Sequence, residues 1–116
     1  MVVLGLNAFC ATAAARVGEM VAGTTVLVHP HGRNEVGKNR WYLDRSLRGI
    51  VRNGNVHSAL VVGYERETTE RFVDEVRAAT GKRVEAVVLL ECGGSWAAAA
   101  EGAKKAAALV LEASRA

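Results

Sequence analysis

Two histidines stand two positions apart in this chain, and their spacing suits several kinds of chemistry. His29 and His31 follow Thr24–Val28, an apolar run of strand length. In an extended chain both rings project to the same side, and Pro30 holds the segment extended between them. Such a pair suits two ligands of a divalent metal, or a base with its orienting partner, although a polar loop without a metal is the commoner explanation. A third ligand would come from a neighbouring loop, with Cys10, Glu35, Glu67 and Glu91 as the candidates.

A cysteine near the start of the first predicted helix is a further candidate. Asn7 offers a side-chain cap for a helix over Ala8–Ala22, and Cys10 falls in its first turn. Unpaired N–H groups and the positive end of the helix dipole favour a thiolate there, which is the form that acts as a nucleophile or a metal ligand. The alternative is a small buried packing residue, because free cysteine is among the most buried residue types.

Two glycines precede the last predicted helix, which runs from Trp96 to about Ser114. Gly93 and Gly94 let backbone N–H groups approach an anion closely, and Ser95 is a good N-cap for the helix. The alternative is a tight strand-to-helix turn without a ligand.

The hydrophobic pattern alternates between strands and helices along the whole chain. Strands are predicted at Val2–Leu6, Thr24–Val28, Val56–Val62 and Val84–Leu90. Helices are predicted at Ala8–Ala22, from Trp41 to a stop at Asn53, from about Glu70 to Thr80, and from Trp96 to about Ser114, with Val17, Met20, Phe72, Val73 and Val76 facing inward. The order βαβαβαβα predicts one α/β domain over residues 1–116, a three-layer sandwich with a four-stranded parallel sheet of Rossmann-like or flavodoxin-like type.

The Val56–Val62 strand is apolar on both faces, which places it inside the sheet. In an open parallel sheet the loops after the strands meet at the carboxyl edge, where ligands bind. Those loops are Asn7–Cys10, His29–Asn34, Gly63–Glu67 and Glu91–Ser95. Every polar feature named above lies in them, and their residue types suit a small anion such as a sugar carboxylate.

The composition excludes several classes of protein. Half of the 116 residues are hydrophobic, but no apolar run reaches membrane-spanning length and no basic signal-peptide flank is present, so a soluble, cytoplasmic protein is expected. The net charge of +3 comes from basic residues interspersed with acidic ones, which argues against nucleic-acid binding. Two distant cysteines are expected to be thiols, not a disulfide.

Three stretches of the sequence carry a resemblance to a known family: R-S-L-R-G-I-V-R-N-G-N-V-H-S-A-L-V-V-G-Y-E-R-E, V-L-G-L-N-A-F-C-A-T-A-A-A-R-V and V-L-V-H-P-H-G. They are similar to segments of the altronate and galactarate dehydratases, whose large part also resembles sulfolactate sulfo-lyase. Gly93-Gly94-Ser95 corresponds to a Gly-Gly-Thr in that family. The resemblance covers nearly the whole chain, although the family enzymes are several times longer.

The resemblance fails inside two loops. Arg33 and Asn34 stand where the family has Cys-Gly, and Glu65 and Arg66 stand where it has Gly and Cys. Of three family cysteines only Cys10 remains, so a site built from several thiolates cannot be intact. A guanidinium repels a metal ion and attracts a carboxylate, so Arg33 and Arg66 favour an anion over a metal at this edge.

The resemblance implies a sugar-acid or hydroxy-acid dehydratase-like lyase domain or subunit. His29 or His31 would be the base that removes the proton α to the carboxylate, with Cys10 as the third catalytic candidate. The candidates for substrate binding are Asn7, Gly32, Arg33, Asn34, Glu67, Gly93, Gly94 and Ser95. A divalent metal, iron or manganese, would assist loss of the β-hydroxyl.

Two other classes of function stay open. One is a non-catalytic relative that binds a small anion or a partner protein and has lost its thiols. The other is a nucleotide- or phosphate-binding module, but the sequence contains neither a G-x-G-x-x-G motif nor a P-loop that would support it. Because a four-stranded sheet leaves open edges, we also expect a homo-oligomer, with a further subunit completing any activity.

Overall fold

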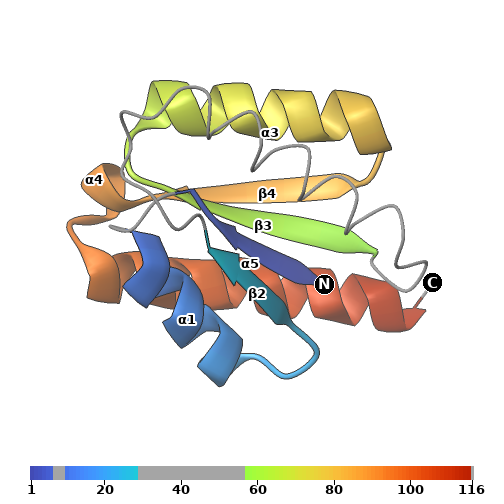
Figure 1. Ribbon diagram of the computed structural model, residues 1–116. Helices are drawn as coiled ribbons and strands as arrows, with labels where there is room; N and C mark the ends of the chain where they lie inside the picture. Colours follow the sequence, from blue (N-terminus) through green and yellow to red (C-terminus); the bar gives the residue numbers. More distant parts are fainter. Residues whose placement is uncertain (7–9, 29–56, 116) are drawn as a thin grey trace.

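A computed structural model of the chain describes residues 1–6, 10–28 and 57–115 (Figure 1). The described elements are, in chain order, β1 (Val2–Gly5), α1 (Ala11–Met20), β2 (Thr25–Val28), β3 (Ser58–Gly63), α3 (Arg66–Thr80), β4 (Arg83–Val88), α4 (Leu89–Cys92) and α5 (Ser95–Arg115). The helix predicted from Trp41 lies outside the described residues. Among the described helices, none combines the length and the apolarity that crossing a membrane requires.

The four strands form one parallel sheet, as the sequence predicts, and their order in the sheet is β2-β1-β3-β4. Val3 lies beside Val26 of β2 on one side and beside Leu60 of β3 on the other. All six residues of β3 are buried, and Val61 is completely inaccessible, which confirms the interior position of this strand. Apolar side chains on both faces make an interior position the favourable one, because helices cover each face.

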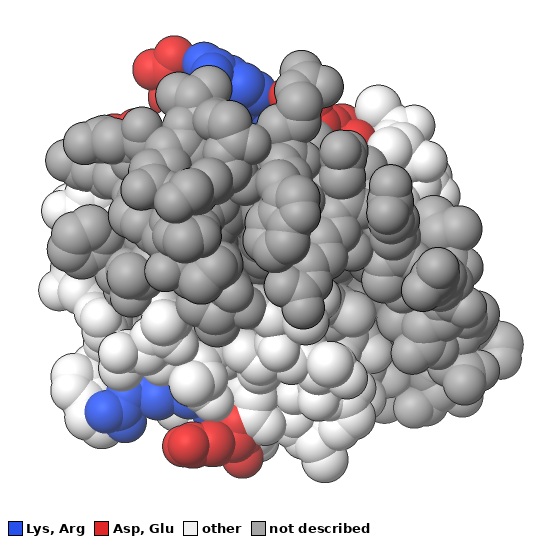
Figure 2. Space-filling view, viewed as in Figure 1, with Lys and Arg blue, Asp and Glu red and all other residues white. Residues whose placement is uncertain are grey.

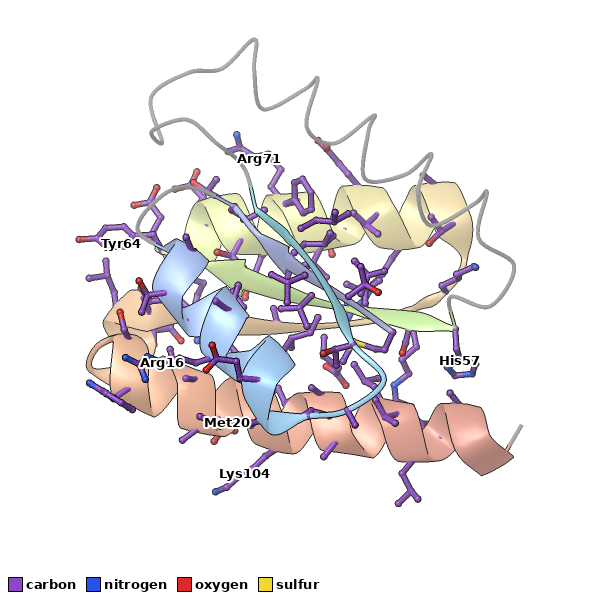
Figure 3. The ribbon with its side chains drawn as sticks, turned by 60° about the horizontal axis from the view of Figure 1, so that its bottom comes forward. Arg16, Met20, His57, Tyr64, Arg71 and Lys104 are labelled. Atoms are coloured by element: carbon purple, nitrogen blue, oxygen red, sulfur yellow. The ribbon has the colours of Figure 1, made fainter. Side chains whose placement is uncertain are left out.

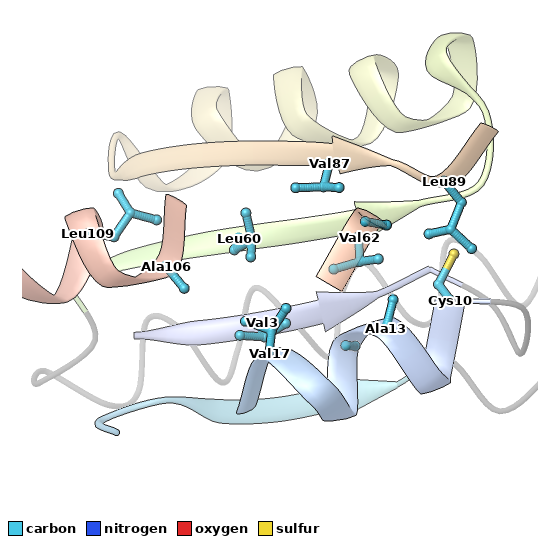
Figure 4. Close-up of a cluster of buried hydrophobic side chains, with 12 residues drawn as sticks. Val3, Cys10, Ala13, Val17, Leu60, Val62, Val87, Leu89, Ala106 and Leu109 are labelled. Atoms are coloured by element: carbon cyan, nitrogen blue, oxygen red, sulfur yellow. The ribbon is translucent and has the colours of Figure 1, made fainter. Parts of the chain in front are cut away.

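Helices lie on both faces of the sheet, which confirms the three-layer arrangement (Figure 1). α1 and α5 pack together on one face, whereas α3 packs on the other against β3 and β4. Side chains alternate along each strand, so Leu60 and Val62 point into the α1–α5 layer while Ala59 and Val61 point towards α3. Figure 4 shows the first of these two clusters, in which Val17 and Leu109 from the two helices meet Leu60.

The last strand is shorter than predicted. β4 ends at Val88, and the next four residues form the short helix α4 instead of extending the strand to Leu90. The backbone N–H of Leu90 donates to the Tyr64 carbonyl at 3.2 Å, which turns the chain across the end of β3. The apolar residues Leu89 and Leu90 resemble a strand in the sequence, because a short apolar run has no period that distinguishes the two structures.

Three predictions about helices are corrected. α3 begins at Arg66, about four residues before the predicted start, so Thr69 does not precede the helix. Instead, the Thr69 hydroxyl donates to the Glu65 carbonyl at 2.6 Å inside the first turn. α1 is shorter than Ala8–Ala22, and Met20 is 52% exposed where an inward position was predicted. Val17, Val73 and Val76 are buried as predicted, and Phe72 is partly buried.

Candidate functional site at the carboxyl edge of the sheet

Three described segments meet at the carboxyl edge. The Leu6 N–H donates to the Val62 carbonyl at 3.0 Å, which joins the end of β1 to the end of β3. The bond from Leu90 to Tyr64 joins the end of β3 to α4 in the same way. This edge therefore holds the start of α1, the start of α3 and the turn between α4 and α5, as the topology predicts.

Cys10 occupies the N-cap position of α1 and is completely buried. Its neighbours in the core include Ala13 of the same helix and Leu89 of α4, and in Figure 4 its sulfur points towards Leu89. The thiol is thus at the predicted edge but lies underneath α4, which matches the packing role that the sequence left as the alternative. Cys10 and Cys92 do not form a disulfide, as expected.

Arg66 is engaged by two carboxylates. Its Nε donates to Glu91 Oε2 at 2.6 Å, its Nη2 donates to Glu91 Oε1, and its Nη1 donates to Glu70 Oε1 at 2.9 Å. The hydrogen bond with Glu91, followed by the one with Glu70, raises the pKa of Arg66 above its ordinary value. The guanidinium that was expected to attract a substrate carboxylate therefore already has carboxylate partners, and it ties the start of α3 to α4.

Glu67 lies in the first turn of α3 and is highly exposed. Its Oε1 accepts a bond from Arg71 at 3.2 Å, one helical turn further on. Figure 3 shows Arg71 on the outer side of α3, so this pair runs along the helix surface. On the face shown in Figure 2, coloured basic and acidic side chains likewise lie next to one another.

The two glycines before α5 form a closed turn. Gly93 and Gly94 have φ values of 90° and 129°, which L side chains rarely adopt. Both of their N–H groups donate to the Leu89 carbonyl at 3.2 Å, and the Gly94 carbonyl accepts the Ala98 N–H at 2.9 Å. These amides close α4 instead of pointing towards an anion, and Ser95 is the first residue of α5, not the residue before it.

Several predicted site residues lie outside the described part of the chain: Asn7, His29, His31, Gly32, Arg33 and Asn34. His57, which is described, is exposed just before β3 and so lies at the opposite end of that strand (Figure 3). Within residues 1–6, 10–28 and 57–115, no three ligand-type side chains group together as a metal site would require. Glu67 and Glu91, proposed as third ligands, are each paired with an arginine.

The sequence analysis missed an arginine close to the glycine turn. The Arg16 guanidinium of α1 lies 3.6 Å from the centroid of the Trp96 ring, in the first turn of α5 (Figure 3). Trp96 is 69% exposed, and the buried Nε of Arg16 has no hydrogen-bond acceptor among the described residues. Within the described residues, Arg16 forms no salt bridge with a carboxylate. An arginine directly after three alanines in an otherwise apolar helix is the signal that could have revealed it.

Comparison with known proteins finds a family match and a similar relative. The family model described as "D-galactarate dehydratase/Altronate hydrolase, second domain" matches residues 1–114. A (2R)-sulfolactate sulfo-lyase subunit beta from Chromohalobacter salexigens is 35% identical over 114 residues, which cover 98% of this chain and 29% of that relative. The chain therefore spans less than a third of the length of this relative. No solved structure matches the chain significantly.

Proposed function

We propose that this chain, which belongs to the D-galactarate dehydratase/altronate hydrolase second-domain family, is a lyase domain or subunit that acts on a small hydroxy acid. The observation that carries this proposal is the 35% identity to a sulfo-lyase subunit along 98% of the chain. A match of that extent includes all four strands and the loops after them, where a parallel α/β sheet binds its ligands.

The proposed reaction is an elimination next to a carboxylate. His29 or His31 takes the proton on the carbon α to the carboxylate, and the electron pair of that C–H bond forms the new carbon–carbon double bond. The hydroxyl on the β carbon of galactarate or altronate leaves as water by taking the proton that the histidine has accepted, and the β-sulfonate of sulfolactate leaves as sulfite. Cys10 is the third residue that we propose for this machinery, and because it is completely buried, α4 would have to move for its thiol to reach a substrate. Iron or manganese is the cofactor to be tested, with His29 and His31 as candidate ligands, since the described residues hold no group of three ligand-type side chains.

Substrate binding is proposed for the loops of the same edge. The proposed residues are Asn7, Gly32, Arg33, Asn34, Glu67 and Ser95; Gly93 and Gly94 are no longer included, because their amides donate to the Leu89 carbonyl. Arg16 is added to them, because a guanidinium without a carboxylate partner in the described chain is available to a ligand, whereas Arg66 is already paired. A positive charge at Arg16 without a carboxylate partner in the described chain supports an acidic substrate such as galactarate, altronate or sulfolactate.

A partner is part of the proposal. The matched relative is named as a subunit, and this chain covers 29% of its length. We therefore propose that activity in the cytoplasm requires a second copy of the chain and a further subunit that completes the site. Two large apolar side chains at the carboxyl edge are exposed and suit such a contact: Leu90, which is 59% exposed, and Trp96.

Calorimetric titration of the purified chain with galactarate, altronate and sulfolactate tests the proposal. Dehydration and sulfite release are measured in parallel, with iron or manganese supplied. His31→Ala is expected to lower turnover by about 10² or more, as loss of a general base does, whereas the surface variant Lys104→Ala leaves it unchanged.

A non-catalytic relative is the second candidate. Arg66, which replaces a family cysteine, is paired with Glu91 and Glu70, and Cys10 is buried under α4. Both observations suit a fold that has kept its shape after losing thiol chemistry. If the unaltered chain binds none of the three acids and shows no turnover, the enzyme proposal falls and this candidate replaces it.

A further inference from the structure

β4 is an outer strand of the described sheet, and its open side carries a groove. The groove has a volume of about 440 Å³ and lies between α3 on one face of the sheet and α5 on the other. Its floor is the backbone edge of β4, and its walls include Arg77 and Asp74 from α3 and Lys105 and Glu101 from α5. An edge of this kind exposes N–H and C=O groups that can pair with a strand from another chain.

Two carbonyls on this edge already have donors. Arg77 Nη2 donates to the Val84 carbonyl at 2.6 Å, and Lys105 Nζ donates to the Ala86 carbonyl at 2.7 Å. Val84 and Ala86 are two residues apart, so their carbonyls point to the same side of the strand, away from β3. The two donors come from helices on opposite faces, so the edge is closed from above and from below.

An added strand would have to remove both donors. Hydrogen bonds from a guanidinium or an ammonium are about twice as strong as those between neutral groups, so a neutral backbone N–H is the weaker competitor. The long stems of both side chains also fill part of the space that an added strand would occupy. Lysine and arginine on an edge strand are known devices against unwanted pairing.

We infer that Arg77 and Lys105 close the β4 edge to strand pairing, so that assembly of this chain uses a surface other than β4. This inference concerns the geometry of assembly and is independent of the proposed lyase activity. It also limits the expectation that open sheet edges drive association, because one of the two outer strands is blocked by its own helices.

The test is the double variant Arg77→Met/Lys105→Met, which keeps the apolar stems but removes both donors. Sedimentation velocity over a range of concentrations should show an association constant about tenfold higher than that of the unaltered chain. The matched control is Arg71→Met/Lys104→Met, which removes the same charges from the same helices. Arg71 pairs with Glu67 and Lys104 points away from the sheet in Figure 3, so the control should not change the constant. An equal constant in both double variants overturns the inference.

Hydrogen exchange on the unaltered protein decides the question if the double variant does not fold. The Val84 and Ala86 N–H groups lie on the open side of β4 with their carbonyls. Their exchange rates should be the same in dilute and concentrated solution. Slower exchange on concentration would mean that β4 is an assembly edge, and the inference would be wrong.

Discussion

The β3–α3 junction and the α1–α5 crossing each contain an arginine and a glycine packed against a neighbouring side chain. The two regions differ in the partners of the arginine. At the β3–α3 junction, Arg66 has two carboxylate partners and Gly63 lies against Thr69. At the α1–α5 crossing, Arg16 lies on the ring of Trp96 and has no carboxylate partner in the described chain. Charge pairing at the junction connects two elements, whereas the Arg16 cation, which has no carboxylate partner among the described residues, is the one that we propose for a ligand.

The two regions also differ in how much space surrounds their glycines. A Cβ on Gly63 would lie 2.7 Å from Thr69 Cβ and nearer still to its hydroxyl. A Cβ on Gly102 of α5 would lie 2.9 Å from a terminal methyl of Val17. At the junction, Thr69 cannot move aside for an added Cβ because its hydroxyl is bonded to the Glu65 carbonyl. At the crossing, an added Cβ would contact only the end of the apolar Val17 side chain.

The largest expected effect is that of Gly63→Ala. Overlap with a buried, hydrogen-bonded side chain should lower the free energy of unfolding by about 2 to 3 kcal/mol, measured by urea denaturation. Adding Thr69→Ala removes two of the three overlapping atoms, so the double variant should recover part of the loss. A change below about 0.5 kcal/mol for Gly63→Ala would show that the junction is not tight.

Arg16→Ala and Arg66→Ala test the difference in charge pairing. Removing Arg16 should weaken the binding of galactarate about tenfold in calorimetric titration, because a carboxylate loses its guanidinium. Removing Arg66 should change the affinity less than about twofold, because its donors serve Glu91 and Glu70. A larger loss from Arg66→Ala than from Arg16→Ala would reverse the assignment, and Arg16→Lys shows whether charge alone suffices.

The smallest expected effect is that of Gly102→Ala. Alanine favours a helix over glycine by about 1 kcal/mol, and contact with Val17 offsets this gain in the unaltered background. The substitution should therefore change the free energy of unfolding by less than about 1 kcal/mol, measured by urea denaturation. With Val17→Ala in place it should stabilise by about 0.5 to 1 kcal/mol, and no difference between the two backgrounds would contradict the contact.

Much of the framework is predictable from local pattern. Val3, Leu60 and Val61 belong to apolar runs too short and too continuous for an exposed element, and the alternation with helices predicts the parallel sheet. Prediction was weaker where an element ends. Leu89 and Leu90 continue an apolar run in the sequence, but a hydrogen bond to Tyr64 turns them into a helix.

The site was predictable as a location more than as a set of contacts. The carboxyl ends of β1, β3 and β4 meet at one edge, as a parallel sheet requires, and the family assignment from short similar stretches is confirmed. Roles for His29, His31 and the other residues outside the described part remain predictions. The exposure of Met20 and the burial of Cys10 depend on which helices pack over them, and this cannot be predicted from the local sequence.

By itself the sequence determined the order of the four strands with α1, α3 and α5, the parallel sheet with β3 inside, and the edge at which strand ends meet, because these follow from periodicities of a few residues. Only the tertiary structure decided that Arg66 is paired, that the Gly93 and Gly94 amides close a turn, and that Arg77 and Lys105 cover the edge of β4. The reason is distance along the chain: Glu91 is 25 residues from Arg66 and Ala86 is 19 from Lys105, so these bonds exist only once the layers have packed.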